Sequence, residues 1–256
     1  MRWIRLTGLV LILGLASAAR AQREVVVFAA SSLRESFAEL GQRFERAHPG
    51  VKVVFNLSGS QELRTQIENG AQADVFASAD LKHMRALQEA NLVSAPHVFA
   101  RNQPVLVVPK GNPAGLRGLH DLPEAHRIVL GVPDVPIGAY SLRVLDAASR
   151  EYGADFRAKV EARVVSREMN VRQVLAKVGL GEADAAIVYR TDFAAAGQKV
   201  EMIAIPPRVN VEAEYPIATV EKSKEAALAR EFVELVLSPA GQEVLSRFGF
   251  GNGSGS

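Results

Sequence analysis

The feature that most constrains this chain is an apolar strand that runs directly into a serine-rich helix start. Residues 25–30 (VVVFAA) are apolar and rich in β-branched side chains, which is typical of a buried strand. Ser31 and Ser32 follow, and Ser32 together with Glu35 matches a capping box, so we expect a helix to begin there. A strand that ends at such a helix directs backbone N–H groups and hydroxyls at one point. That arrangement suits an anion and needs no cationic side chain.

The N-terminus carries the pattern of an export signal. Residues 1–5 are basic, residues 6–15 are largely apolar, and residues 19–21 (ARA) form a small-x-small cleavage motif. The apolar stretch is short for a membrane span, which makes an uncleaved anchor the weaker alternative. We therefore expect residues 1–21 to be a cleavable signal peptide and the mature protein to be exported and soluble.

Charge and cysteine content exclude several classes of protein. The signal segment contains three arginines and no acidic residue, so its removal lowers the formal charge from +2 to −1. The mature chain is therefore not basic, and no nucleic-acid partner is indicated. The chain has no cysteine, which excludes disulfides, thiolate chemistry, cysteine-ligated zinc and a lipid anchor on an N-terminal cysteine.

Strand and helix patterns alternate along the mature chain, first up to about residue 90 and again from residue 105. This order predicts an α/β fold with mainly parallel sheets flanked by helices. A strand is expected at residues 160–165, and two closing helices at 226–237 and 239–248. Residues 251–256 offer no core-forming side chain, so we expect a disordered tail there.

In four places a predicted strand ends where a helix begins. These places are Ser32, Ser60, Ile137–Gly138 and Asn170–Val171. Ligands of open α/β sheets bind beyond the carboxyl ends of the strands, so one small ligand between two such sheets could contact all four. Each place alone has a plainer interpretation, since the serines could be simple helix caps and the glycine a turn residue. The recurrence is what favours an anion site.

Other polar residues near strand ends are less informative. Tyr189 closes an apolar strand, where its hydroxyl could lie at the surface or donate to a ligand at the mouth of a cleft. Asp74 and Asp80 are interpreted as backbone caps rather than metal ligands. The five histidines lack metal-ligand spacing, and we expect most of them to be solvated.

The motifs of common enzyme classes are absent from the sequence. It contains no GxSxG, HExxH, P-loop or dinucleotide-binding fingerprint. No histidine is placed in an obvious way to serve a serine nucleophile. The sequence therefore predicts a binding protein, not an enzyme, and no cofactor.

Together these segments resemble the periplasmic molybdate-binding proteins of ABC transporters, which have the two-lobed type II periplasmic binding protein fold. The matching segments cover nearly the whole mature chain and occur in the family's order. They are residues 27–33 (VFAASSL), 58–60 (SGS), 73–80 (ADVFASAD), 135–140 (VPIGAY), 170–172 (NVR), 187–189 (IVY) and 214–218 (EYPIA).

The resemblance also implies which residues bind the oxyanion. Two serines would contribute hydroxyls and amides, a tyrosine its hydroxyl, and two further residues their backbone N–H groups. These residues are Ser32, Ser60, Tyr189, Ile137 and Val171. The family often has a small residue where this chain has isoleucine, so a backbone contact is retained but the size of the pocket can differ. Whether Ser31 or Ser32 points its hydroxyl inward stays open at this point.

The resemblance further implies how the chain is divided and what it works with. Lobe 1 would comprise residues 22–101 and 207–250, and lobe 2 would be an insertion of residues 102–206. The expected ligands are molybdate and tungstate, and the expected partners are an inner-membrane ABC permease and its ATPase. We expect a periplasmic monomer.

Rival ligands and classes are separated by their chemistry. Molybdate and tungstate are fully deprotonated dianions that need only donors, whereas phosphate usually keeps a proton and favours a carboxylate acceptor. Sulfate and thiosulfate remain alternatives, while ferric ion would favour a tyrosine pair, and none is evident near Tyr189. A deaminase of the porphobilinogen type needs a cysteine that this chain lacks, and no helix-turn-helix supports a sensor domain.

Overall fold

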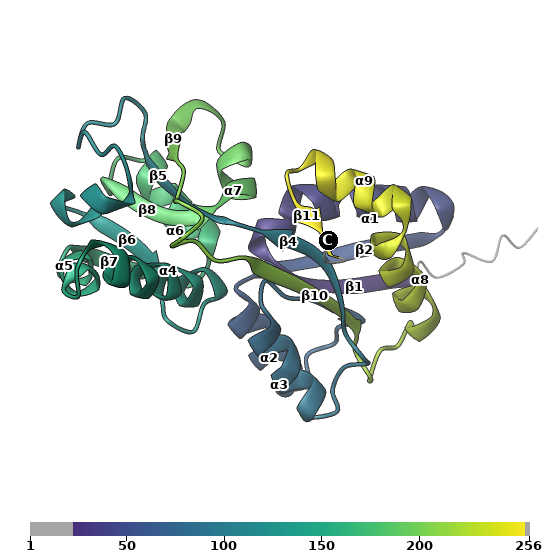
Figure 1. Cartoon of the computed structure of the whole chain (residues 1–256). Helices are drawn as coiled ribbons and strands as arrows, with labels where there is room; N and C mark the ends of the chain where they lie inside the picture. Colours follow the sequence, from purple (N-terminus) through teal and green to yellow (C-terminus); the bar gives the residue numbers. More distant parts are fainter. Residues whose placement is uncertain (1–22, 254–256) are drawn as a thin grey trace, which may run out of the picture.

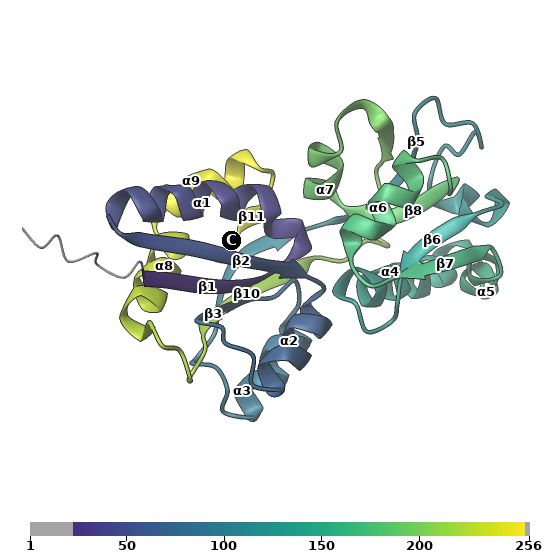
Figure 2. The same cartoon turned by 180° about the vertical axis from the view of Figure 1, so that it is seen from behind.

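The computed structural model describes residues 23–253, so the expected signal peptide lies outside the described residues. The described chain forms two α/β units, each built around one sheet (Figures 1 and 2). We call the unit with the six-stranded sheet lobe 1 and the unit with the five-stranded sheet lobe 2. The predicted two-lobed α/β fold is therefore confirmed. Within residues 23–253, no helix combines the length and apolar character that crossing a bilayer requires.

The sheet of lobe 1 has the strand order β11-β4-β10-β3-β1-β2. β1 pairs in parallel with β2 and β3, whereas β10 runs antiparallel to β3 and β4. Its strands are β1 (Arg23–Ala30), β2 (Val51–Ser58), β3 (Val75–Ala77), β4 (His97–Asn102), β10 (Ala213–Thr219) and β11 (Gly251–Asn252).

Helices cover both faces of this sheet because its strands are apolar on both sides. In β1, Val25 and Val27 point to one face and belong to a hydrophobic cluster with α1. Phe28 points to the other face and belongs to a second cluster with α2 and α3. Figure 1 shows α1, α8 and α9 on one side of the sheet and α2 and α3 on the other. These helices are α1 (Arg34–Ala47), α2 (Ser60–Glu68), α3 (Leu81–Glu89), α8 (Ala226–Leu237) and α9 (Pro239–Arg247).

The sheet of lobe 2 has the strand order β7-β6-β8-β5-β9. β6 is parallel to β7 and β8, and β5 is antiparallel to β8 and β9. Its strands are β5 (Pro104–Pro109), β6 (Ile128–Gly131), β7 (Val164–Glu168), β8 (Ala185–Tyr189) and β9 (Val200–Ile203).

The positions of the helices of lobe 2 follow from the crossover connections between its parallel strands. The chain passes from β6 to its neighbour β7 by way of α4 and α5, and from β7 back to β8 by way of α6. Because parallel crossovers are right-handed, two crossovers in opposite directions place α4 and α6 on opposite faces. The helices are α4 (Pro136–Tyr152), α5 (Phe156–Glu161), α6 (Val171–Gly179) and α7 (Arg190–Ala195), with short 3-10 turns at η2 (Leu119–Glu124) and η3 (Gly197–Lys199). A further 3-10 turn, η1 (Ser31–Leu33), belongs to lobe 1 and joins β1 to α1.

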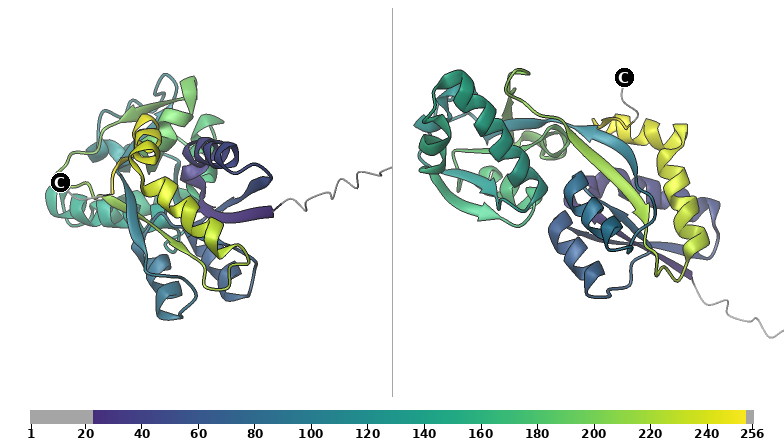
Figure 3. Two further views of the ribbon diagram at one scale, coloured as in Figure 1. Left: turned by 90° about the vertical axis from the view of Figure 1, so that its right-hand side faces the viewer. Right: turned by 60° about the horizontal axis from the view of Figure 1, so that its bottom comes forward.

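The chain crosses between the lobes twice, and the two crossings lie side by side (Figure 3). The first is the single residue Gln103 between β4 and β5, and the second is the segment 204–212 between β9 and β10. β4 and β10 are paired up to this point, with Ala213 opposite Asn102. The carboxyl ends of β1 and β2 therefore face lobe 2 across the gap that these two segments span (Figure 1).

The strand predicted at residues 160–165 is wrong in its first half. Residues 156–161 form α5, and β7 begins only at Val164. Phe156 and Val160 are both buried and lie four residues apart, so they share one helical face. A short apolar run with this spacing suits a helix as well as a strand.

The disordered tail predicted from residue 251 is also wrong for its first residues. Gly251–Asn252 form β11, which pairs antiparallel with β4, with Gly251 opposite Arg101. Backbone pairing needs no apolar side chain, and glycine permits the close approach. A Cβ atom on Gly253 would lie 2.7 Å from the Phe99 Cα. Residues 254–256 lie outside the described residues.

Gly138 is required by packing rather than by a turn. It lies in the first turn of α4, where a Cβ atom would collide with the Val132 carbonyl and lie 2.7 Å from the Gly131 carbonyl oxygen. We predict that Gly138→Ala lowers the free energy of unfolding by roughly 1–3 kcal/mol, as overpacking does elsewhere. Gly179→Ala is the matched control, because its Cβ would meet nothing closer than 3.8 Å. Equal urea midpoints for both variants would contradict the packing argument.

Candidate functional site

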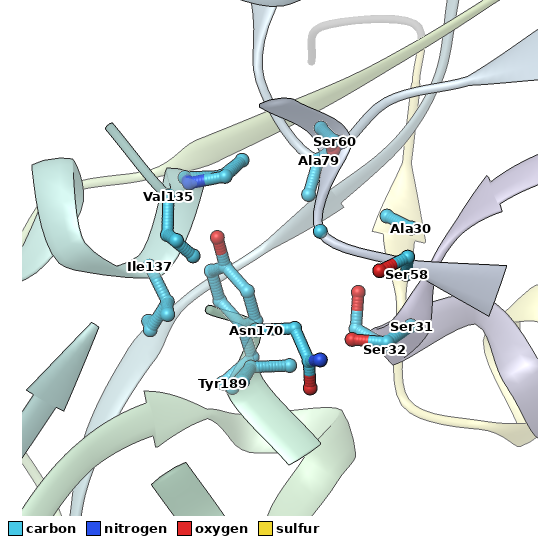
Figure 4. A pocket seen from close by; sticks show the side chains of 13 residues that line it. Ala30, Ser31, Ser32, Ser58, Ser60, Ala79, Val135, Ile137, Asn170 and Tyr189 are labelled. Atoms are coloured by element: carbon cyan, nitrogen blue, oxygen red, sulfur yellow. Dashed lines mark hydrogen bonds between the residues drawn. The ribbon is translucent and has the colours of Figure 1, made fainter. Parts of the chain in front are cut away.

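The five residues expected to bind a ligand line one pocket between the lobes (Figure 4). Its empty volume is about 210 Å³ including the open mouth, below the roughly 300–1,000 Å³ of common small-molecule sites. A compact ion fits this space better than an extended organic ligand. The lining residues are Ala30, Ser31, Ser32, Ser58, Gly59, Ser60, Ala79, Val135, Pro136, Ile137, Asn170, Val171 and Tyr189.

The two serines are not helix caps, contrary to the plainer interpretation of the sequence. Ser32 lies in the 3-10 turn η1, and α1 begins at Arg34 without a side-chain cap, so the expected capping box with Glu35 does not form. Ser60 is the first residue of α2, after Gly59 at the cap position. The Ser60 Oγ instead accepts a hydrogen bond of 3.0 Å from the Ala79 N–H. Both hydroxyls are therefore available to the pocket rather than used by their own helix.

The other two helix starts present backbone donors, as the sequence predicts. The Asn170 side chain caps α6 by accepting from the Arg172 and Gln173 N–H groups, both at 3.1 Å. The Val171 N–H precedes these capped amides and has no acceptor within the helix. α4 starts with Pro136, which has no N–H, so Ile137 provides the first amide of that helix.

Tyr189 lies deeper than a residue at the mouth of a cleft. Its side chain is 1% exposed, and its hydroxyl has no hydrogen-bond partner among the described residues. Figure 4 shows that the hydroxyl points among the other lining residues. Burial raises the pKa of this phenol well above 10, so it keeps its proton and acts as a donor. A buried donor without an acceptor carries a free-energy cost that a bound anion would remove.

Two further tyrosines surround Tyr189, which the sequence did not reveal. The rings of Tyr140 and Tyr215 lie 6.3 and 5.8 Å from the Tyr189 ring between centroids. The expectation of no tyrosine pair near Tyr189 is therefore wrong, because the three residues come from distant segments. Burial raises the pKa of Tyr140 to about 12 and that of Tyr215 well above 10, which disfavours the phenolates that ferric ion needs. The described residues also contain no cluster of three metal-ligating side chains.

No charged side chain belongs to the described residues that line the pocket. A charge cluster follows Val171 in α6, where Arg172 forms ion pairs with Glu35 of lobe 1 and with Asp192. The Arg172 Nε lies 3.0 Å from the Asp192 Oδ1, although the two are not aligned as a hydrogen bond. This cluster was not predicted from the sequence, since its members lie in the three separate helices α1, α6 and α7.

The lobes contact one another on two sides of the pocket. On one side the Gln61 Nε2 donates to the Met169 carbonyl over 2.8 Å, next to Gly59, where a Cβ would collide with that carbonyl. On the other side His83 Nε2 donates to the Asp134 carbonyl over 2.8 Å. His83 is fully buried, whereas His97, His120 and His126 are exposed, so the expectation that most histidines are solvated is confirmed with His83 as the exception. The described structure is thus a closed arrangement of the two lobes.

The two aspartates interpreted as caps do cap backbone groups. Asp80 accepts from the His83 N–H at the start of α3 over 3.0 Å. Asp74 accepts from the Val26 N–H over 2.8 Å and from the Ser223 hydroxyl over 2.6 Å. Both side chains therefore act within lobe 1.

Asp192 makes the stability of the protein depend on pH. Burial raises its pKa to about 7, although Arg172 opposes this, whereas an exposed aspartate has a pKa near 4. The folded state therefore binds one more proton than the unfolded state between about pH 4 and 7, and this group lowers stability as pH rises through that range. Above pH 7 this group has lowered the free energy of unfolding by roughly 4 kcal/mol relative to its value below pH 4.

We predict that Asp192→Asn removes this part of the pH dependence. The melting temperature of the variant relative to wild type should rise between pH 5 and 8, whatever the constant effect of the substitution. Thermal denaturation of both proteins over this range measures the difference. Parallel curves would contradict the assigned titration.

Known proteins resemble this chain in sequence and in fold. The model of the bacterial extracellular solute-binding protein family matches residues 25–251. The molybdate-binding protein ModA of Mycobacterium tuberculosis is 38% identical over 98% of this chain and 99% of its own length. The substrate-binding domain of a putative molybdenum ABC transporter from Clostridium difficile is 28% identical, with a TM-score of 0.66 over 90% of this chain and 98% of that one.

A likeness to a protein with another ligand shows how general this fold is. The sulfate-binding protein SubI of Mycobacterium tuberculosis superimposes with a TM-score of 0.81 over 89% of this chain and 86% of that one, at 19% identity. At that identity the likeness concerns the fold alone. The family match and the 38% identical relative go further, and together they show that this chain belongs to the bacterial extracellular solute-binding proteins, in the family that includes ModA.

Proposed function

We propose that this protein captures molybdate, and tungstate with it, in the periplasm for an ABC importer. The observation that carries the proposal is the buried Tyr189 hydroxyl, which has no partner among the described residues and lies in a pocket lined only by neutral groups. Such a site offers an anion several donors at once. The similarity to ModA points to the identity of that anion.

The chemistry of the donors favours a fully deprotonated dianion. The Ser60 oxygen already accepts from the Ala79 N–H, so its own proton is free to be donated into the pocket. The amides of Ile137 and Val171 can only donate, and the protonated hydroxyl of Tyr189, which has no partner among the described residues, has its proton to donate. Hydrogen phosphate would need an acceptor for its proton, and no carboxylate belongs to the described lining.

The remaining parts of the proposal rest on family membership and sequence. We infer that Ser32, Ser60, Ile137, Val171 and Tyr189 contact the oxyanion. Export would follow cleavage of residues 1–21, and an inner-membrane permease with its ATPase would receive the ligand. The protein would act as a monomeric binding protein without enzymatic activity or a resident cofactor.

We predict that molybdate and tungstate stabilise the protein selectively. A ligand present at about 1,000 times its dissociation constant adds roughly 4 kcal/mol of stability if it binds only the folded state. Thermal denaturation with molybdate, tungstate, sulfate, thiosulfate and phosphate at equal ionic strength tests this. An increase in melting temperature with sulfate or phosphate, and none with molybdate or tungstate, would rule out the proposed ligand.

We predict that Tyr189→Phe lowers the affinity for molybdate about tenfold, which corresponds to roughly 1.4 kcal/mol. The substitution removes one donor and keeps the ring that packs on Tyr140 and Tyr215. Isothermal titration calorimetry measures the change. Tyr152→Phe is the matched control, since Tyr152 packs on Phe156 and does not line the pocket. Wild-type affinity in the Tyr189 variant would show that this hydroxyl is not a ligand.

A further inference from the structure

A chain of hydrogen bonds runs behind the pocket and ends at Ser32. The Tyr215 hydroxyl lies 3.1 Å from the Ser32 Oγ and 3.4 Å from the Asn102 Nδ2. All three side chains are at most 3% exposed, so water does not compete for these bonds. Tyr215 does not line the pocket itself. Any influence it has on a ligand therefore passes through Ser32.

The direction of the chain is fixed at its far end by Asn102. The Gln103 N–H donates to the Asn102 Oδ1 over 2.9 Å, and a backbone N–H cannot act as an acceptor. The amide Nδ2 must then face the other way, where it donates to the Thr191 Oγ1 over 2.8 Å and to the Tyr215 oxygen over 3.4 Å. The Tyr215 oxygen then already receives one proton, and the Ser32 Oγ at 3.1 Å is the acceptor available to its own O–H.

This direction decides what Ser32 presents to the pocket. A serine hydroxyl can donate or accept, but an oxygen that already accepts from Tyr215 has its proton left to donate. Ser60 is arranged in the same way by the Ala79 N–H. Two other serine hydroxyls of the pocket are not arranged in this way. The Ser58 hydroxyl donates to the Glu62 carboxylate, and no hydrogen bond of the Ser31 hydroxyl is found in the part of the chain that the structure describes.

We propose that Tyr215 is a positioning residue that keeps the Ser32 hydroxyl as a donor, and so raises the preference of the site for fully deprotonated oxyanions over those that carry a proton. The proposal rests on the proposed function, in that Ser32 contacts the bound anion. It adds a residue outside the pocket that sets the direction of a proton within it.

A double-mutant cycle tests whether Tyr215 acts through Ser32. Molybdate affinity is measured by calorimetry for wild type, Tyr215→Phe, Ser32→Ala and the double variant. We expect Tyr215→Phe to lower the affinity for molybdate about three- to tenfold, which corresponds to the loss of one hydrogen bond. The double variant should then bind no more than twofold more weakly than Ser32→Ala alone. Additive losses, or an unchanged affinity in Tyr215→Phe, would overturn the proposal.

A competition experiment tests the effect on specificity. At pH 6 inorganic phosphate carries a proton, and in Tyr215→Phe the Ser32 hydroxyl is free to accept it. Phosphate should therefore displace molybdate from the variant at a lower ratio of phosphate to molybdate than from wild type. An equal ratio for both proteins, or displacement from neither, would overturn the effect on specificity.

Further variants separate positioning from folding. The Tyr215→Phe variant retains the ring that makes edge contacts with Phe99 and Phe250, and melting curves check that each variant is folded. Tyr140→Phe removes another buried hydroxyl of the same cluster and should leave molybdate affinity unchanged. Asn102→Asp replaces the donor with an acceptor that draws the Tyr215 proton away from Ser32, so it should weaken binding at least as much as Tyr215→Phe. Wild-type affinity in Asn102→Asp would show that the assigned direction is wrong.

The cycle also distinguishes this proposal from the proposed function. If wild type binds sulfate and not molybdate, the choice of ligand fails, and the same cycle run with sulfate still tests Tyr215. If wild type binds molybdate and the two losses add, only the role of Tyr215 fails.

Discussion

A small dianion that leaves water loses many hydrogen bonds, and the protein has to replace them with donors that are already held in place. Neutral donors do this without leaving a buried cation behind when the ligand departs. Helix starts supply them, because their first N–H groups have no partner within the helix. The parallel strands of the two sheets direct their carboxyl ends at one gap, which is why Ser32, Ser60, Ile137 and Val171 converge on one pocket. The rest of the two lobes keeps these four residues in place around the pocket.

Charge is present near the pocket but not in it. Arg172 follows the donor at Val171 and joins Glu35 of lobe 1 to the buried Asp192. The arginine therefore bridges the lobes and is balanced by carboxylates, while the ligand contacts remain neutral. An ion pair across the gap favours the closed arrangement. The selectivity of the contacts and the closure of the lobes are thus assigned to different groups, which can be altered separately.

The sequence predicts the features that depend on local patterns. The strand at residues 25–30, the helix start at Asn170 and the convergence of four strand ends follow from apolar runs and turn residues. Features that depend on distant segments were missed, such as the tyrosines around Tyr189 and the pairing of residues 251–252 with β4. The capping box at Ser32 failed for a related reason, because the serine hydroxyl meets Tyr215 from a strand far along the chain.

The similarity to a sulfate-binding protein explains why the fold alone does not identify the ligand. A sulfate-binding protein superimposes closely on this chain at 19% identity, so the fold is shared with a protein named for another oxyanion. What remains to distinguish them is the size of the pocket and the direction of each proton in it. In this chain the first depends on side chains such as Ile137, and the second on partners behind the pocket, the Ala79 N–H for Ser60 and Tyr215 for Ser32. Specificity is therefore expected to lie as much in residues that never touch the ligand as in those that do.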